Sequence, residues 1–292
     1  MATFRGVSIS RSGGTVAYVP VTGASINPTR SLITEQSFGS AGEAKIYDGG
    51  VINTGSFDGA LRNIDVVKYA ITDVMDVMCG TLAALPYNTI VIGDETNGLS
   101  FASTAINSFE LSLTVKDYAK VKYNFVSCKV GTVAAITGVT SPTSYADPIP
   151  IASVSQISCP DAGIKFSAIT INGQIPIDQD YYVIGTKQLY DILQSGNGSL
   201  SGTLTLASSE WLGLQKAAGD CGDIGTITLT LNTPGATCSD PAVLIATITI
   251  TNVKIESGSA SAQGRARFDK TINWRAEVNS TTNTTATMIV FA

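Results

Sequence analysis

Two short stretches of this chain read almost alike. Residues 55–61 (GSFDGAL) and 198–204 (GSLSGTL) share the pattern Gly-Ser-apolar-polar-Gly-small-Leu, and they lie about half a chain apart. Each precedes a segment with helical character, and these segments end in Cys-Gly pairs at Cys79 and Cys221. A chain that repeats a strand-helix plan in this way is built from copies of one unit more readily than from a single irregular core.

A third landmark follows in the same order. The stretch KVKY, which contains Lys120 and Lys122, is echoed by RARF, which contains Arg265 and Arg267. Three matches in sequence order indicate an internal duplication, and 292 residues suffice for two domains that each bury a core. The predicted boundaries are 1–138 for the first module, 139–150 for a linker rich in Pro, Ser and Thr, and 151–292 for the second module.

The periodicity of apolar residues predicts strands with few helices. Phe109, Leu111 and Leu113 alternate with Glu110 and Ser112, which is the pattern of a half-buried strand. A single helix is predicted in each module, one from Asn63 as its N-cap to Gly80 and one from Ser208 to about Ala218. The fold class is therefore mainly β (α+β), with two tandem β-sandwich or barrel modules that each carry one flanking helix.

Two long segments lack this patterning. Residues 27–50 form a polar stretch in the first module, and residues 175–197 stand at the corresponding place in the second, with a short helix predicted at 186–193. Unpatterned segments of this length inside a compact module usually have a function. We predict that both are interaction loops.

The composition argues against several classes of function. The net charge is −5 and the charged fraction only 14%, so the chain lacks the basic footprint of a nucleic-acid-binding protein. No apolar run approaches the roughly 20 residues of a membrane span, and no signal peptide is expected from the N-terminal sequence. Five cysteines without CxxC spacing favour free thiols in a reducing cytoplasm.

No catalytic constellation is visible in the sequence. The chain has no histidine, which excludes histidine-based triads and metal sites. The carboxylate pairs Asp178/Asp180 and Asp220/Asp223 could hold Ca²⁺ or serve a carbohydrate-active enzyme, but loop solvation and helix capping are the favoured interpretation. We expect no enzyme activity, no catalytic or metal-binding residue and no cofactor.

Taken together, a Gly-Ser-x-x-Gly strand, a helix, a long early loop and a late basic-aromatic strand resemble the tail tube (major tail) proteins of tailed bacterial viruses. The resemblance covers residues 24–130 and 164–278 and rests on architecture and short motifs. It implies β-sandwich modules that form six-fold rings with a continuous inner barrel, stacked into a tube through the early loop. This chain differs from single-module members in being double.

From this resemblance we expect a structural virion protein of the tail, assembled in the host cytoplasm. Its partners would be other copies of itself, other tail proteins and viral DNA in transit without specific binding, with no membrane insertion of its own. Three double-module chains would close one pseudo-hexameric ring. The alternative is a two-module surface or pilus-like protein, which predicts a secretion signal and paired cysteines.

Residue roles follow from the requirement that DNA must not adhere to the bore, since each neutralised phosphate adds affinity. An acidic-to-neutral lumen is expected, and basic residues should lie at protomer contacts or on the outer wall. The lumen candidates are Asp58, Glu110, Ser112, Ser201 and Thr203; the ring-stacking candidates are Ser37, Glu43, Tyr181 and Tyr182; the protomer-contact candidates are Lys120, Lys122, Arg265 and Arg267.

Overall fold

The computed structural model describes sixteen segments of the chain, and they are dominated by strands. The described residues are 6–11, 17–19, 21–34, 46–62, 64–80, 85–93, 98–115, 117–129, 132–134, 154–158, 166–184, 189–206, 223–233, 243–261, 269–278 and 289–291. Within them a single helix accompanies seventeen strands. The prediction of a mainly β fold is confirmed.

The strands of the first half precede and follow the helix α1 (Ile64–Cys79). They are β1 (Gly6–Arg11), β2 (Ala17–Val19), β3 (Gly23–Thr34), β4 (Ile46–Ala60), β5 (Asn88–Gly93), β6 (Gly98–Thr114), β7 (Lys120–Ser127) and β8 (Thr132–Ala134). Those of the second half are β9 (Val154–Ser158), β10 (Phe166–Gln174), β11 (Ile177–Asp178), β12 (Leu193–Gln194), β13 (Ser199–Leu206), β14 (Asp223–Thr233), β15 (Val243–Ser261), β16 (Asp269–Ala276) and β17 (Ile289–Phe291).

Two long strands, β6 and β15, change partners part-way along their length. The N-terminal half of β6 pairs with β5 and β8, and its C-terminal half pairs with β7 and β10. Likewise, β15 pairs first with β14 and β17 and then with β16. The changes occur next to Ser103 and Asn252, which have left-handed φ values of 52° and 55°. Such values are uncommon outside glycine, and here they mark the point where each strand changes from one set of partner strands to the other.

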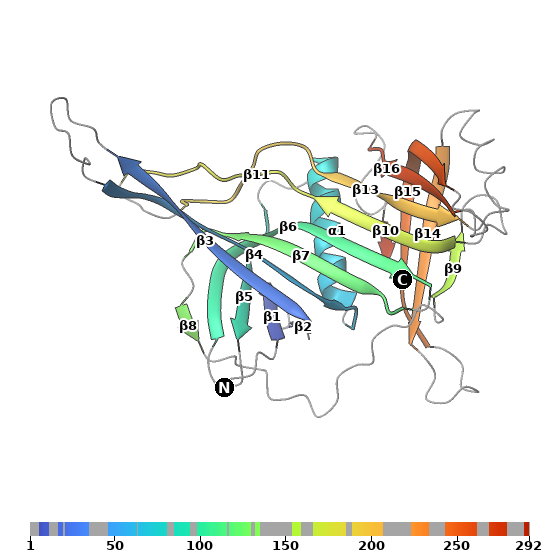
Figure 1. The fold of residues 1–292 in the computed structure, drawn as a ribbon, viewed down its shortest axis with the longest axis horizontal. Helices are drawn as coiled ribbons and strands as arrows, with labels where there is room; N and C mark the ends of the chain where they lie inside the picture. Colours follow the sequence, from blue (N-terminus) through green and yellow to red (C-terminus); the bar gives the residue numbers. More distant parts are fainter. Residues whose placement is uncertain are drawn as a thin grey trace.

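The same pairing order therefore occurs in both halves. It runs β1-β5-β6-β7-β4-β3 with β8 on β6, and β9-β14-β15-β16-β13-β10 with β17 on β15. The halves are also joined, because β6 pairs with β10 with Leu111 opposite Ile171. Among the described strands, the result is one eight-stranded layer in the order β3-β4-β7-β6-β10-β13-β16-β15, which crosses the molecule in Figure 1.

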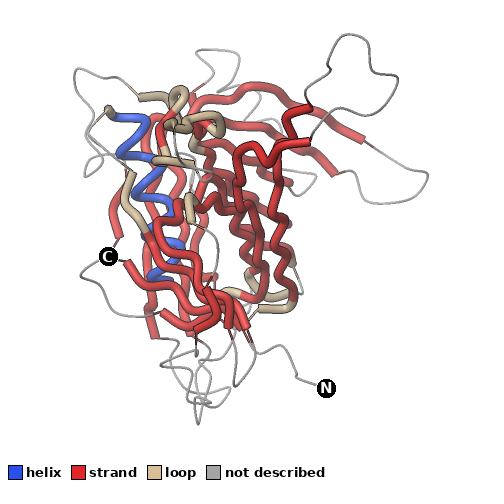
Figure 2. The backbone as a smooth tube through the Cα atoms, turned by 90° about the vertical axis from the view of Figure 1, so that its left-hand side faces the viewer, coloured by secondary structure: helices blue, strands red, loops and turns tan. Residues whose placement is uncertain are grey.

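Helix α1 packs against the middle of this layer rather than against one half. Its predicted apolar face is buried, with Val67, Ala70, Ile71 and Val74 at most 1% exposed. The helix contacts β6 of the first half and β10, β13 and β17 of the second, and Figure 2 shows it lying alongside the strands. It ends at Gly80, whose φ of +67° is the left-handed conformation expected there. The second predicted helix, the cap Asn63 and the linker lie outside the described residues.

The first predicted interaction loop is in fact a long β-hairpin. Strands β3 and β4 pair from Gly23 opposite Asp58 to Thr34 opposite Ile46, and they form an arm that leaves the body of the molecule (Figures 1 and 2). The apolar alternation is missing because both faces of the arm are exposed, as the neighbouring residues Thr29 and Arg30 show. Backbone pairing, which leaves no trace in hydrophobic periodicity, holds the arm together.

The second segment is not helical at residues 189–194. Instead, β11 pairs with β12, with Ile177 opposite Gln194. The segment runs in the same direction as the arm in Figure 1, and Tyr182 lies against Gly50 of β4, where an added Cβ would come within 2.3 Å of the Tyr182 ring. The helix predicted at 186–193 is therefore wrong for residues 189–193, whose path is extended; residues 186–188 lie outside the described residues.

The structure changes the alignment of the two repeats. Gly55 lies beneath the ring of Phe125, and Gly202 lies against the ring of Trp274; both glycines also approach a backbone oxygen of the preceding paired strand. Gly55 therefore corresponds to Gly202 and not to Gly198. The four-residue shift keeps the same face of each strand inward, because side chains alternate with a period of two.

Candidate functional site

The eight-stranded layer has one buried face and one polar face. On β7, Val121, Tyr123 and Phe125 are at most 4% exposed, whereas Lys120 and Lys122, which alternate with them, are exposed. The buried face packs against α1, which contacts β6, β10 and β13. The polar face runs without interruption across the junction of the two halves and is the candidate functional surface.

All five predicted lumen residues lie on this polar face. Cross-strand partners share a face, and the register links one residue on each of six neighbouring strands. That row consists of Asp58, Lys122, Glu110, Asn172, Ser201 and Arg275. Ser112 and Thr203 are joined by a second row through Thr170, whose hydroxyl lies 2.7 Å from that of Thr203.

Lys120 and Lys122, predicted at protomer contacts or on the outer wall, share one face with the acidic and polar lumen candidates. Lys122 is directly opposite both Asp58 and Glu110, so the basic and acidic residues share one face. Lys120 forms an ion pair with Asp117 at the adjoining turn, and this hydrogen bond is the main reason that the pKa of Asp117 is lowered. Opposite charges in neighbouring strands attract, which is the physical reason for their mixing.

The basic echo at Arg265 and Arg267 lies outside the described residues. The register nevertheless shows that KVKY corresponds to another stretch, because Phe125 and Trp274 occupy equivalent places beside Gly55 and Gly202. In the second half, a different arginine, Arg275, supplies the positive charge of the polar face and pairs with Glu256 at 3.2 Å.

The predicted stacking residues fall in two groups. Ser37 and Glu43, which fall between β3 and β4 in the sequence, lie outside the described residues. Tyr181 and Tyr182 are both described: Tyr181 packs edge-on against Tyr190 with ring centroids 5.7 Å apart, and Tyr182 covers Gly50. Burial, with a smaller contribution from Asp180, raises the pKa of Tyr182. The second segment thus braces the arm.

Two edges of the eight-stranded layer are open in the described structure. β3 pairs with β4 only, and β15 beyond residue 255 pairs with β16 only. Beside the β15 edge lies a pocket of about 630 Å³ whose lining includes Met78, Ile255, Glu256, Ala276 and Glu277. Sequence reasoning missed this pocket, because its lining comes from four separate stretches of the chain.

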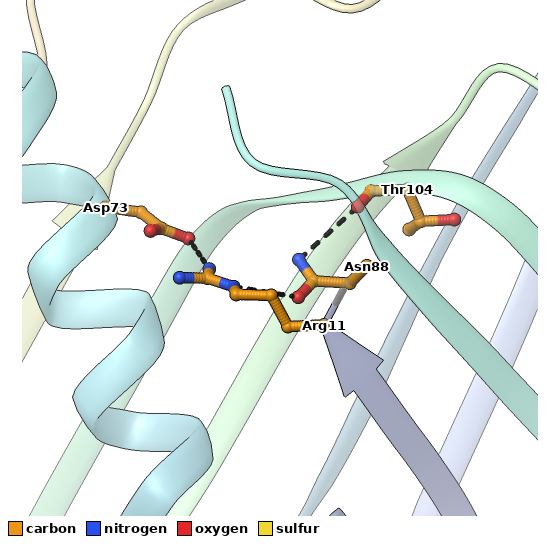
Figure 3. A network of polar contacts seen from close by, with 4 residues as sticks. All are labelled: Arg11, Asp73, Asn88 and Thr104. Carbon is orange, nitrogen blue, oxygen red and sulfur yellow. Dashed lines mark hydrogen bonds and ion pairs between the residues drawn. The ribbon is translucent and has the colours of Figure 1, made fainter. Parts of the chain in front are cut away.

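A buried polar network ties β1 to the helix (Figure 3). Arg11 forms an ion pair with Asp73 and donates to the Asn88 side-chain oxygen at 3.3 Å, while Asn88 donates to the carbonyl of Thr104 at 3.4 Å. The Arg11 guanidinium also stacks 4.5 Å above the Tyr69 ring centroid. Loss of hydration raises the pKa of Asp73 to about 6, although Arg11 acts in the opposite direction.

The described residues do not offer a metal site, since no three Cys, Asp or Glu side chains gather to hold an ion. Cys128 has a free thiol whose pKa is raised to about 11 by burial; Cys159, Cys221 and Cys238 lie outside the described residues. The described helix is too short to cross a membrane. Comparison with protein-family models gave no match, and comparison with curated proteins also gave none.

Proposed function

We propose that this protein is a structural, self-assembling virion protein whose chains close into rings that stack into the tail tube of a bacterial virus. The observation that carries the proposal is the eight-stranded layer, which spans both halves, presents one uninterrupted polar face and ends in two open edges. Open edges favour pairing with another strand, and closure into a barrel removes them.

The repeated pairing order supports a two-module chain. Each half contributes four strands to the layer, and the halves meet where β6, the counterpart of β15, pairs with β10, the counterpart of β3. Both halves also carry the same polar contacts. The Asn124 amide donates to Ser108 at 2.7 Å, and the Asn273 amide donates to Ser257 at 2.8 Å, in corresponding places.

Three chains per ring suit this geometry. Eight strands from each of three chains would give 24 strands, and a strand spacing of about 4.8 Å gives a barrel about 37 Å across before strand tilt widens it. This diameter, measured between the strand backbones, is larger than the diameter of a B-form duplex. Six chains would double the width and leave a bore far larger than DNA needs.

The arm supports stacking between rings. β3 and β4 form an arm at one end of the layer, and Tyr182 braces this arm through its contact with Gly50. A braced hairpin of this kind can reach a neighbouring ring while its base stays in the barrel. Other tail proteins would contact the end rings, and DNA would pass the polar face without specific binding. The protein would act without catalysis or a cofactor, in the virion tail, after assembly in the host cytoplasm.

The test is direct observation of the assembly. Purified protein, concentrated and examined by negative-stain electron microscopy, should form rings or tubes with three-fold symmetry in cross-section. Native mass measurement of a single ring should give three chains. Monomeric protein at all concentrations, or rings of six chains, would contradict the proposal in its assembly or its stoichiometry respectively.

A surface or pilus-like protein is the second candidate, and the open β3 edge favours it equally, because such an edge can accept a strand donated by a partner. Head-to-tail pairing that does not close would produce a thin filament instead of a ring. The same micrographs therefore separate the two functions.

A further inference from the structure

We infer that β3 of one chain pairs antiparallel with the C-terminal half of β15 of a second copy, in a register with Asn27 opposite Ser259. The inference deepens the proposed function and rests on its self-association. It names the two surfaces that meet and the residue pairs between them, and it is argued from a junction that the chain already contains.

That internal junction is the pairing of β6 with β10. Phe109 lies opposite Gly173, Glu110 opposite Asn172 and Leu111 opposite Ile171. The Ile175 amide donates to the Asn107 carbonyl at 2.7 Å, and the Val115 amide donates to the Ser167 carbonyl at 3.0 Å. The odd-numbered residues of both strands therefore carry the hydrogen bonds that join the two halves.

Four independent contacts establish which residues correspond between the halves. Each half contains the same four kinds of contact. They are an aromatic ring against a glycine, a pair of hydroxyl groups, an asparagine side-chain amide donating to a serine hydroxyl, and a backbone amide donating to the carbonyl of the residue with left-handed φ. The matched pairs are Phe125–Gly55 with Trp274–Gly202, Ser25–Ser56 with Thr170–Thr203, Asn124–Ser108 with Asn273–Ser257, and Cys128–Ser103 with Glu277–Asn252.

These matches identify the open edges as the missing half of the junction. Ser25 corresponds to Thr170, so β3 is the counterpart of β10; Ser257 corresponds to Ser108, so this half of β15 is the counterpart of β6. Inside the chain the β6 edge is covered by β10. The β15 edge has no such strand among the described residues, and a second copy's β3 is the strand that fits.

The register follows by transferring each internal pair. Gly173 opposite Phe109 becomes Pro28 opposite Gly258, Asn172 opposite Glu110 becomes Asn27 opposite Ser259, and Ile171 opposite Leu111 becomes Ile26 opposite Ala260. Just beyond the ends of β4 and β7, the Leu61 amide donates to the Ala119 carbonyl, so the odd-numbered residues of β4 bond to β7 and the even-numbered ones to β3. The backbone of Ile26 therefore points to the open edge. Ile26 and Ala260 can then exchange two hydrogen bonds.

The residues on the two edges are complementary. Pro28 has no amide hydrogen, yet its carbonyl can accept from Gly258, and the absent side chain of Gly258 leaves room for the proline ring. Arg30, which is exposed, falls opposite Glu256, a carboxylate already held by Arg275. Asn27 and Ser259 are both exposed and continue the polar face across the contact.

Disulfide cross-linking tests the register. Asn27 and Ser259 form a non-hydrogen-bonded pair, whose Cα atoms lie about 4.5 Å apart and so suit a disulfide. The double variant Asn27→Cys/Ser259→Cys should give covalent dimers and trimers on non-reducing gels after mild oxidation. A mixture of the two single variants should stop at dimers, because each chain then carries one new cysteine.

The matched control shifts the register by four residues. In Ser25→Cys/Ser257→Cys the two sites are separated by about 13 Å along the strand and should not cross-link. Cross-linking of this control in place of the first pair would overturn the inference. Rings seen by microscopy without cross-linking of the first pair would overturn the register while leaving the proposed function intact; absence of both rings and cross-links would overturn both.

Discussion

At the scale of single residues, Asp73 makes the stability of the fold depend on pH. Its pKa is raised to about 6 from 3.8, mainly by burial, so the folded state holds this proton more tightly than the unfolded state. Stability is then fully present below about pH 4 and falls as the pH rises to about 6, by about 2 to 3 kcal/mol. Urea unfolding of wild type and Asp73→Asn should show this fall only in wild type. A difference between the two proteins that does not change with pH would contradict it.

Tyr123 offers a second residue-scale prediction. Its hydroxyl is buried without a hydrogen-bond partner among the described residues, while its ring packs 4.9 Å from that of Phe57. Tyr123→Phe should therefore leave stability unchanged or raise it by up to about 1 kcal/mol, whereas Tyr123→Ala should lose about 3 to 5 kcal/mol. Thermal unfolding measures both. A clear loss in the Phe variant would show that the hydroxyl bonds a group outside the described residues.

At the scale of elements, the glycines of the repeated strands permit close approach of neighbouring strands. A Cβ on Gly202 would lie 1.9 Å from the Thr170 carbonyl oxygen and 2.7 Å from the Trp274 ring. Because a paired backbone strand cannot move aside without breaking hydrogen bonds, Gly202→Ala should lower the free energy of unfolding by about 3 kcal/mol or more. Gly196→Ala is the matched control, because its nearest neighbour is the Pro176 ring at 3.6 Å. Equal stability of the two variants in urea would show that the strands are not packed this closely.

The elements also show what can be predicted from this sequence. Alternation located β7 and the second half of β6, and helical periodicity located α1 up to Gly80. Periodicity did not reveal the arm, because residues on both of its faces are exposed. It also did not reveal that β6 extends to both sides of Ser103, because the left-handed conformation of this residue interrupts the pattern. Alternation predicted which residues of a strand face away from the core. It could not predict that Lys122 lies beside Asp58, because that depends on the order of the strands in the sheet, which no local pattern encodes.

At the scale of the whole molecule, the arm should separate folding from polymerisation. Its paired strands β3 and β4 belong to the eight-stranded layer, whereas residues 37–43 fall between these two strands in the sequence. A chain lacking residues 37–43 should keep its circular dichroism spectrum and melting temperature yet form no tubes. Replacing the same residues with Gly-Ser repeats of equal length separates loss of sequence from loss of length. Tubes of normal length from either variant would show that residues 37–43 do not join the rings.

The charge of the polar face decides how DNA behaves in an assembled tube. In each chain Lys122 stands between Asp58 and Glu110, so the carboxylates offset a cation that would otherwise attract phosphate. Glu110→Lys changes this row by two charges per chain, or six in a ring of three, and each phosphate neutralised adds a counterion-release gain with a salt slope of about −0.9. Tubes of this variant should retain duplex DNA at low salt and release it as salt rises, whereas wild-type tubes should retain none. Asp65→Lys makes the same charge change on α1, on the opposite side of the layer, and should leave tubes unable to retain DNA. Retention by the Asp65 variant alone would place the polar face outside the bore.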